Sequence, residues 1–222
     1  MTELDIKGVG MTSQRTRDRL IDQLREMGIK NEDVLNVMSK VPRHLFVDQA
    51  MATRSYENTA LPIGYGQTIS QPYIVAKMTE LILGDSVTNT VLEVGTGSGY
   101  QAAILGGLVR DLHTVERITP LYRNARELLY QLGYRNVRAH LADGGWGWPE
   151  CAPYDAIIAT AAPPEVPEAL KQQLAVGGRL VIPVGSANNK QILQVIRRIS
   201  AETFETEPGE SVVFVPLLEE II

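Results

Sequence analysis

Three alternating glycines follow a short apolar run at residues 91–94, which itself contains one acidic residue. The run reads Val-Leu-Glu-Val with its carboxylate at Glu93, and the glycines are Gly95, Gly97 and Gly99. A helical pattern resumes directly afterwards, so these residues predict a strand, a tight turn and a helix. A turn of this kind brings bare backbone against a nucleotide-like ligand at the carboxyl edge of a parallel sheet.

The spacing of the glycines narrows the choice of ligand. A dinucleotide-binding turn follows G-x-G-x-x-G, whereas this chain has G-x-G-x-G. The shorter pattern resembles that of S-adenosylmethionine-dependent methyltransferases with a Rossmann-like fold, in which there is no pyrophosphate to cradle. Acidic groups nearby suit the ammonium group and the positive sulfur of that ligand. The expected contacts are Glu93, Gly95, Thr96, Gly97, Ser98 and Gly99.

A second acidic residue favours this interpretation over an ordinary strand-to-helix turn. Glu116 ends the next apolar strand, residues 112–116, about twenty residues after the first. An acidic side chain at that place reaches ribose hydroxyls in this architecture. We therefore expect the turn to bind S-adenosylmethionine, with S-adenosylhomocysteine as the product.

The third strand, residues 137–142, is followed by Asp143 and Gly144. A carboxylate there can accept a hydrogen bond from an exocyclic amine such as that of adenine. The alternative is that Asp143 only closes an Asx turn in its own loop. We favour the ligand role because of its place at the carboxyl end of a strand.

The segment after the fourth strand argues against one class of acceptor. Enzymes that methylate amino groups of bases resemble one another there, with Asn or Asp, two prolines and an aromatic ring that hold a flipped base. This chain has Ala162 before its two prolines and Glu165 after them. The net charge of -5 also lacks the basic field usual in nucleic-acid-binding proteins. We therefore expect no nucleic-acid substrate.

The sequence predicts neither a metal site nor a cysteine nucleophile. His44, His113 and His140 are scattered without the spacing of metal ligands, and we expect structural or surface roles for them. The single cysteine, Cys151, lies before the fourth strand and is interpreted as a packed thiol.

Ser70 is the sharpest catalytic candidate. It lies in residues 54–72, a segment without helical or strand period that mixes Gly, Pro, Gln and hydroxyl residues, and such segments tend to be functional. Its simplest role is the N-cap of the helix expected at residues 72–83. A hydroxyl at a helix N-terminus also attracts a carboxylate. With a pKa of about 4, a carboxylate acceptor needs no general base, so the enzyme only has to orient it and exclude water.

The remaining elements place these residues on an α/β scaffold. Strands are expected at residues 91–94, 112–116, 137–142, 156–160, 180–183, 191–199 and 211–217, with helices at 101–108, 120–132 and 166–174. This alternation predicts a Rossmann-like, doubly wound, mostly parallel sheet of seven strands with helices on both faces. The last two strands, joined by an acidic connection at 200–210, lack an intervening helix, so one of them is expected to be antiparallel.

The part before the sheet predicts an N-terminal helical extension. Amphipathic helices are expected at residues 13–27 and 31–41, and the basic residues of the first are interpreted as a solvated face: Arg15, Arg17, Arg19 and Arg25. The 222 residues indicate a single methyltransferase domain. Within it, residues 1–10 are expected to be a loose extension, 11–89 the helices and substrate loop, and 90–222 the cofactor-binding core.

Taken together, these motifs resemble the bacterial type of protein-L-isoaspartate (D-aspartate) O-methyltransferase, a family of the class I S-adenosylmethionine-dependent methyltransferases. The resemblance runs from about Arg15 to Leu217, and the segment Thr68-Ile69-Ser70 is specific to that family, whereas the glycine turn is not. That segment lies within the carrier at residues 66–73, and the other carriers are residues 41–47, 60–64, 92–101, 115–118, 154–169 and 214–217.

The resemblance implies protein repair. The family methylates the free α-carboxylate of L-isoaspartyl residues in damaged proteins, and the ester then closes to a succinimide. It places the active-site serine at Ser70 and the cofactor contacts at the first glycine turn, Glu116, Asp143 and Gly144. Substrate is expected over residues 54–72 and 214–217, with these contacts: Gln67, Thr68, Ile69 and Val215. The partners of this protein would be damaged or flexible proteins and peptides. The protein itself is expected to be a monomer.

Two other functions stay open at this point. One is a carboxyl methyltransferase of the same fold that acts on aspartate in one dedicated peptide. The other is a non-catalytic S-adenosylmethionine-binding protein, against which the intact Thr68 and Ser70 argue. One cysteine, no apolar segment in residues 1–10 and no run near the ~18 apolar residues of a membrane span lead us to expect a cytoplasmic protein without a membrane contact.

Overall fold

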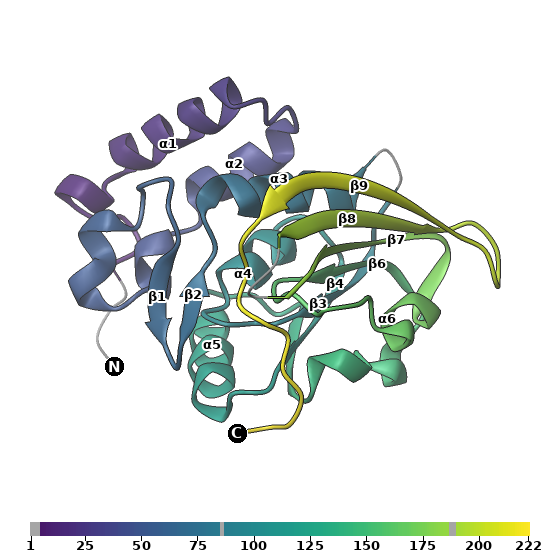
Figure 1. The fold of residues 1–222 in the computed structure, drawn as a ribbon. Coiled ribbons are helices and arrows are strands. Elements are labelled where there is room, and N and C mark those ends of the chain that lie inside the picture. Colours follow the sequence, from purple (N-terminus) through teal and green to yellow (C-terminus); the bar gives the residue numbers. More distant parts are fainter. Residues whose placement is uncertain (1–4, 85–86, 187–189) are drawn as a thin grey trace.

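The central element of the structure is a twisted sheet with helices on both faces (Figure 1). A computed structural model describes residues 5–84, 87–186 and 190–222. Within them the sheet has seven strands in the order β5-β4-β3-β6-β7-β8-β9. The bounds are Thr90–Val94 (β3), Asp111–Glu116 (β4), Val137–Leu141 (β5), Tyr154–Ala159 (β6), Leu174–Val184 (β7), Gln191–Arg198 (β8) and Phe204–Val212 (β9).

The pairing of the strands confirms the expected α/β fold. β5, β4, β3, β6 and β7 pair in parallel, and β8 runs antiparallel to both β7 and β9. The parallel register brings the carboxyl ends of β3, β4 and β6 to one edge, since Val94 lies opposite Val115 on one side and Ala159 on the other. Ligands bind at such an edge in open α/β sheets.

The helices divide the core between the two faces of the sheet. Their bounds are Gln14–Glu26 (α1), Glu32–Lys40 (α2), Pro72–Leu83 (α3), Tyr100–Gly106 (α4), Thr119–Gln131 (α5) and Glu168–Gln172 (α6). One buried cluster joins α1 to α4 with Val91, Ala156 and Ile158, and the other joins α6 with Leu92 and Ile157. Successive residues of β3 and β6 belong to different clusters because successive side chains of a strand point to opposite faces of the sheet.

Among the described helices, none is long and apolar enough to span a bilayer.

The segment before α3 is more regular than its sequence indicates. Residues 61–69 form a small antiparallel hairpin of β1 (Leu61–Gly64) and β2 (Gln67–Ile69), so the expectation of no strand there was wrong. Its turn has positive φ at Tyr65 (53°) and Gly66 (69°), the combination that matches the twist of a two-residue hairpin. Strands of four and three residues are too short to show a period in the sequence.

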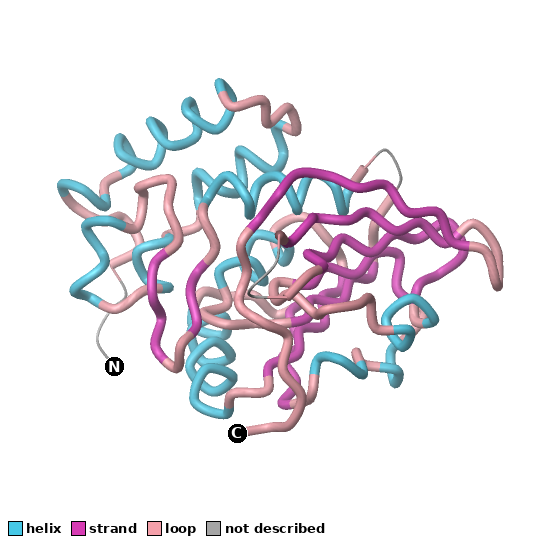
Figure 2. Tube along the Cα trace, viewed as in Figure 1, coloured by secondary structure: helices cyan, strands magenta, loops and turns pink. Residues whose placement is uncertain are grey.

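The last strand also differs from the expectation. The sequence predicts a strand at residues 211–217 after a long acidic connection, whereas β9 is that connection (Figure 2). A tight turn, in which the Ile199 amide donates to the Thr203 carbonyl over 2.8 Å, leads directly from β8 into β9. β9 lies at the edge of the sheet and is mostly exposed. Its polar sequence therefore lacks the apolar signal of a buried strand.

The N-terminal region is tied to the body of the protein from residue 5 onward. Arg17 is only 3% exposed, so its assignment to a solvated face was wrong. Its guanidinium donates to the carbonyls of Ile6, Lys7 and Lys40. The carbonyl of Asp5 bonds the Nε2 atom of His44 over 2.7 Å. Residues 5–7 are therefore anchored, and residues 1–4 of the expected loose extension lie outside the described residues.

Candidate active site

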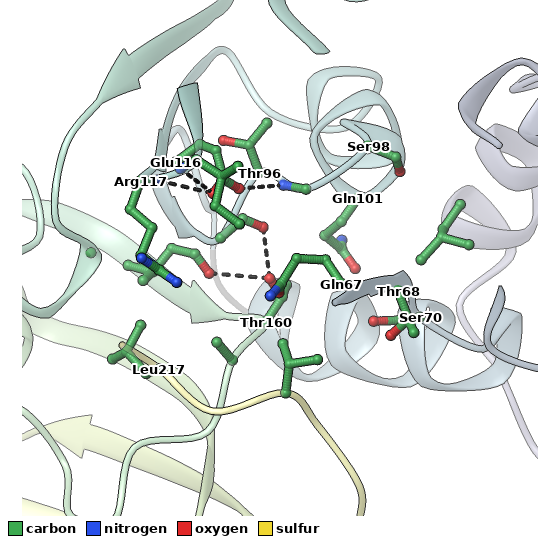
Figure 3. A pocket seen from close by; sticks show the side chains of 18 of the residues that line it. Gln67, Thr68, Ser70, Thr96, Ser98, Gln101, Glu116, Arg117, Thr160 and Leu217 are labelled. Carbon is green, nitrogen blue, oxygen red and sulfur yellow. Dashed lines mark hydrogen bonds between the residues drawn. The ribbon is translucent and has the colours of Figure 1, made fainter. Parts of the chain in front are cut away.

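A cavity lies where the carboxyl ends of β3, β4 and β6 meet residues 67–70 and the C-terminal segment (Figure 3). Figure 3 shows Thr68 and Ser70 side by side on one side of it and Glu116 and Arg117 on the other. The cavity brings together most of the residues expected from the sequence: Gln67, Thr68, Ile69, Ser70, Gly95, Thr96, Gly97, Ser98, Glu116, Gly144 and Val215. Glu93, Gly99 and Asp143 do not line it.

Glu116 joins the ends of two strands through its carboxylate. Its Oε2 atom accepts the amide of Gly97 over 2.8 Å, and its Oε1 atom accepts the amides of Arg117 and Ile118 over 2.9 Å each. Each carboxylate oxygen can accept about two hydrogen bonds. The Oε2 atom therefore keeps one acceptor site, which can receive a ribose hydroxyl from within the cavity.

The glycine turn needs glycine for both conformation and space. Gly95 has a φ of +94°, and a Cβ atom there would lie 2.5 Å from the Oγ1 atom of Thr160. That hydroxyl donates to the Gly95 carbonyl over 2.7 Å, so the residue that follows β6 holds the turn by a hydrogen bond. Gly97 has a φ of +54°, and the φ of Gly99, at the N-cap of α4, is +88°. These conformations are costly for any residue with a side chain.

Glu93 lies behind the cavity rather than in it. Its side chain is fully buried and accepts the hydroxyl of Thr114 over 2.6 Å, and Thr114 in turn contacts the hydroxyl of Thr96 over 2.6 Å. Burial raises the pKa of Glu93 to about 8, and its Oε1 atom has no partner among the described residues. Because Glu93 does not line the cavity, its side chain is not placed to contact the ligand directly. Its side chain supports the turn through the two threonines.

Asp143 forms the Asx turn that the sequence left as the alternative. Its Oδ1 atom accepts the amide of Gly145 over 2.8 Å, at the start of the short helix Gly144–Trp146. Its Oδ2 atom accepts the amide of Glu220 over 3.2 Å. Asp143 lines a neighbouring hollow with Trp146, while Gly144 reaches the main cavity.

Ser70 is not the N-cap of α3. The helix begins at Pro72 with Gln71 in the cap position, and no side chain caps it. Ser70 is half-buried and lines the cavity, and its hydroxyl forms no hydrogen bond to another described residue. Since it is not used for capping, it is available to a bound ligand.

Several lining residues were not expected from the sequence. They are Val75, Val94, Tyr100, Gln101, Val115, Arg117, Ile118, Thr160, Ala161 and Leu218, whereas Pro216 and Leu217 lie in the segment 214–217 over which the substrate was expected. Those that follow β4 and β6 could have been found from the rule that ligands contact the residues after strand ends. Leu218 could not, because it lies beyond the last strand expected at residues 211–217. The apolar members give the cavity a wall suited to an aromatic base.

The histidines and the cysteine have structural surroundings. His113 and His140 lie on neighbouring strands with 3.1 Å between their Nδ1 and Nε2 atoms, so these two are not scattered in space. His140 stacks on Trp148, and burial lowers the pKa of His140 to about 4. Among the described residues, no group of three or more metal-ligating side chains gathers. Cys151 packs, partly buried, against the second core cluster.

Comparison with known proteins decides the family. The family model described as protein-L-isoaspartate (D-aspartate) O-methyltransferase matches residues 15–221. The chain belongs to this family. Protein-L-isoaspartate O-methyltransferases of Cellvibrio japonicus and Halorhodospira halophila are 57% and 56% identical to it, each over 219 residues. The alignments cover 98% of both chains in the first case and 99% of both in the second.

Solved structures agree with the family. A protein-L-isoaspartate O-methyltransferase aligns over 92% of this chain and 67% of its own, at 27% identity and a TM-score of 0.84. A second, a protein-L-isoaspartate O-methyltransferase of Plasmodium falciparum in complex with S-adenosyl-L-homocysteine, aligns over 91% of this chain and 98% of its own. Its identity is 25% and its TM-score 0.79.

The residues around the cavity fit the cofactor of this S-adenosylmethionine-dependent family. Glu116 offers a carboxylate oxygen, Gly95 and Gly97 expose backbone, and Val115, Ile118 and Leu217 give an apolar wall. Carboxylate, bare backbone and apolar surface match the ribose, the amino-acid part and the adenine of S-adenosylmethionine. The chain is thus an enzyme of the S-adenosylmethionine-dependent type.

The raised pKa of Glu93 predicts a pH-dependent stability. Between the ordinary value of 4.5 and about 8, the folded protein holds a proton on Glu93 that the unfolded chain has lost. The contribution of Glu93 to the free energy of unfolding should therefore fall as pH rises through this window, by up to about 1.4 kcal/mol per pH unit. Glu93→Gln should remove that fall, as measured by urea unfolding from pH 5 to pH 8.

The control is Glu26→Gln, at an exposed residue of α1. It should keep the slope of the parent protein. A Glu93→Gln variant with the same pH slope as the parent would show that Glu93 is ionised in the folded state.

Proposed function

We propose that this enzyme repairs damaged proteins by methylating the free α-carboxylate of L-isoaspartyl residues, with Ser70 at the acceptor side. One observation carries this proposal: the unused hydroxyl of Ser70 and the glycine turn closed by Glu116 face one another across a single cavity. Thr68 and Gln67 line the same side as Ser70. The ester so formed would close spontaneously to a succinimide.

The cofactor side is proposed to be held by the turn and the strand ends around it. The binding residues are Gly95, Thr96, Gly97, Ser98, Glu116 and Gly144, with Glu93 and Gly99 supporting the turn from behind. Asp143 lies outside the cavity lining, next to Gly144, but each of its carboxylate oxygens keeps an acceptor site, so it remains our proposed partner for an adenine amino group. When bound, S-adenosylmethionine supplies an electrophilic methyl group on a positively charged sulfur.

The acceptor side has the groups that an ionised nucleophile requires. A carboxylate with a pKa of about 4 is already deprotonated at neutral pH, so no proton has to be removed. Accordingly, the described residues that line the cavity include no histidine, lysine or cysteine that could serve as a base. Ser70 is proposed to donate a hydrogen bond to one carboxylate oxygen and leave the other aimed at the methyl carbon. Orientation of this kind can supply most of the rate enhancement.

The substrate is proposed to enter as an extended chain. Residues 213–217 follow β9 and are tied to the end of β6, since the Val215 carbonyl accepts the amide of Ala162 over 2.8 Å. Val213 is 95% exposed, and Val215 lies in the cavity wall. The hairpin at residues 61–69 borders the cavity through Gln67, Thr68 and Ile69. A damaged, flexible segment can lie between these two edges. We also propose a cytoplasmic monomer in which residues 11–89 and 90–222 work as one domain, since one core cluster includes both.

The proposed substrate can be tested with two peptides that differ only in one linkage. Methyl transfer from labelled S-adenosylmethionine should reach a peptide with one L-isoaspartyl residue and leave its aspartyl twin unmethylated. Equal transfer to both would favour a carboxyl methyltransferase for ordinary aspartate. Binding of S-adenosylhomocysteine without transfer to either peptide would favour a non-catalytic protein.

Ser70→Ala should separate turnover from cofactor binding. Because the hydroxyl contacts only the acceptor in this proposal, kcat should fall by about 10- to 100-fold while the dissociation constant of S-adenosylhomocysteine stays unchanged. Ser39→Ala removes a hydroxyl of α2 that donates to the Asn36 carbonyl and does not line the cavity, and it should leave both quantities as they are. Loss of cofactor affinity in Ser70→Ala would make Ser70 a structural residue.

A further inference from the structure

A buried arginine lies directly behind the Ser70 segment. Arg43 is 0% exposed and starts the short helix Arg43–Phe46, outside the cavity lining. Its Nε atom donates to the Ser55 carbonyl and its Nη2 atom to the Ser70 carbonyl, each over 2.7 Å. Its Nη1 atom has no hydrogen-bond partner among the described residues, and no described carboxylate pairs with it.

Such a group is expensive to bury. Removing a cation from water destabilises the folded state unless partners compensate, and two carbonyls compensate only in part. The ring of Tyr100 lies under the guanidinium, 4.7 Å from its carbon to the ring centroid. Burial lowers the pKa of Arg43 to about 10, which still leaves the group charged at neutral pH. A neutral side chain would fill this place with a smaller loss of folding stability, so the presence of a guanidinium indicates a role besides packing.

The partners of Arg43 come from both sides of the active site. Ser70 carries the proposed acceptor contact, and Tyr100 begins α4 directly after the glycine turn and lines the cavity itself. Ser55, the third partner, lies at the C-terminal end of the short helix Gln49–Arg54. One rigid planar group thus connects the peptide at Ser70 with the helix that carries the cofactor turn. A lysine, with a single point charge on a flexible stem, cannot make the same set of contacts.

We propose that Arg43 is a positioning residue for methyl transfer: it fixes the Ser70 peptide relative to α4, so that the hydroxyl points into the cavity at the acceptor carboxylate. This inference rests on the proposed role of Ser70. It assigns no contact of Arg43 with substrate or cofactor. The loss of its two carbonyl bonds should displace the hydroxyl by a fraction of an ångström to an ångström, which can cost up to about 100-fold in rate.

Arg17 provides a matched control within the same chain. It is also buried, at 3% exposed, donates only to backbone carbonyls, and lies over an aromatic ring, that of Tyr56, at 5.7 Å. Its carbonyl partners are Ile6, Lys7 and Lys40, none of which lines the cavity. A change at Arg17 therefore has the cost of a buried guanidinium without the link to Ser70.

The test compares Arg43→Lys, Arg43→Gln and Arg17→Lys, alone and combined with Ser70→Ala. All rates are expressed per S-adenosylhomocysteine-binding site, so that unfolded molecules are not counted. We expect both Arg43 variants to lower kcat for an isoaspartyl peptide by about 10- to 100-fold, with the dissociation constant of S-adenosylhomocysteine unchanged. Arg17→Lys should change only the urea midpoint. In the Ser70→Ala background the Arg43 variants should have no further effect on kcat, since the hydroxyl they position is gone.

Four other results would contradict the positioning role of Arg43 or the role of Ser70 on which it rests. An Arg43 effect that is equally large with and without Ser70→Ala would overturn the positioning role, as would Arg43 variants with normal kcat. If neither Arg43 variant yields protein that binds S-adenosylhomocysteine, Arg43 is a folding residue and the inference is wrong. If Ser70→Ala itself leaves kcat unchanged, the proposed role of Ser70 fails first.

Discussion

The structure of the active site depends on one carboxylate that accepts three backbone amides. Glu116, at the end of β4, accepts the amide of Gly97 from the turn after β3 and the amides of Arg117 and Ile118 from its own loop. Bonds from amides to a charged acceptor are stronger than neutral ones, and these are shielded from water because Glu116 is 6% exposed. They hold two adjacent strand ends at a fixed distance. The turn can then present bare backbone to a ligand while one oxygen lone pair still points into the cavity.

Two sets of buried polar groups support the two sides of the cavity. On the cofactor side, Glu93, Thr114 and Thr96 form a chain of hydrogen bonds from the core to the turn. On the acceptor side, Arg43 bonds the Ser70 carbonyl and lies over Tyr100. Buried polar groups cost stability unless their partners are placed well, so these sets restrict the backbone to few conformations. This restriction suits a reaction in which the enzyme orients an ionised nucleophile and moves no proton.

Much of the fold could be predicted because its strands are buried and its turns are marked. The parallel strands β3, β4 and β6 are largely buried; β3 is followed by Gly95 and β6 by Thr160, and β4 ends in Glu116. The acidic edge strand β9 and the short β1–β2 hairpin could not be predicted, since backbone pairing rather than an apolar face holds them. The burial of two charged residues was also not predictable from the sequence. A carboxylate at Glu93 and a guanidinium at Arg17 look like ligand-facing or solvated groups, yet tertiary contacts enclose both.

We propose that the acceptor carboxylate and the methyl donor meet in the cavity between residues 67–70 and the glycine turn. A crystal structure of the chain with S-adenosylhomocysteine and an isoaspartyl peptide would show whether they do. We expect the thioether to lie against the turn at Gly95 and Gly97, a ribose hydroxyl to bond Glu116, and the α-carboxylate to lie within hydrogen-bonding distance of the Ser70 hydroxyl. A peptide bound instead in the neighbouring hollow lined by Trp146, with its carboxylate away from Ser70, would contradict it.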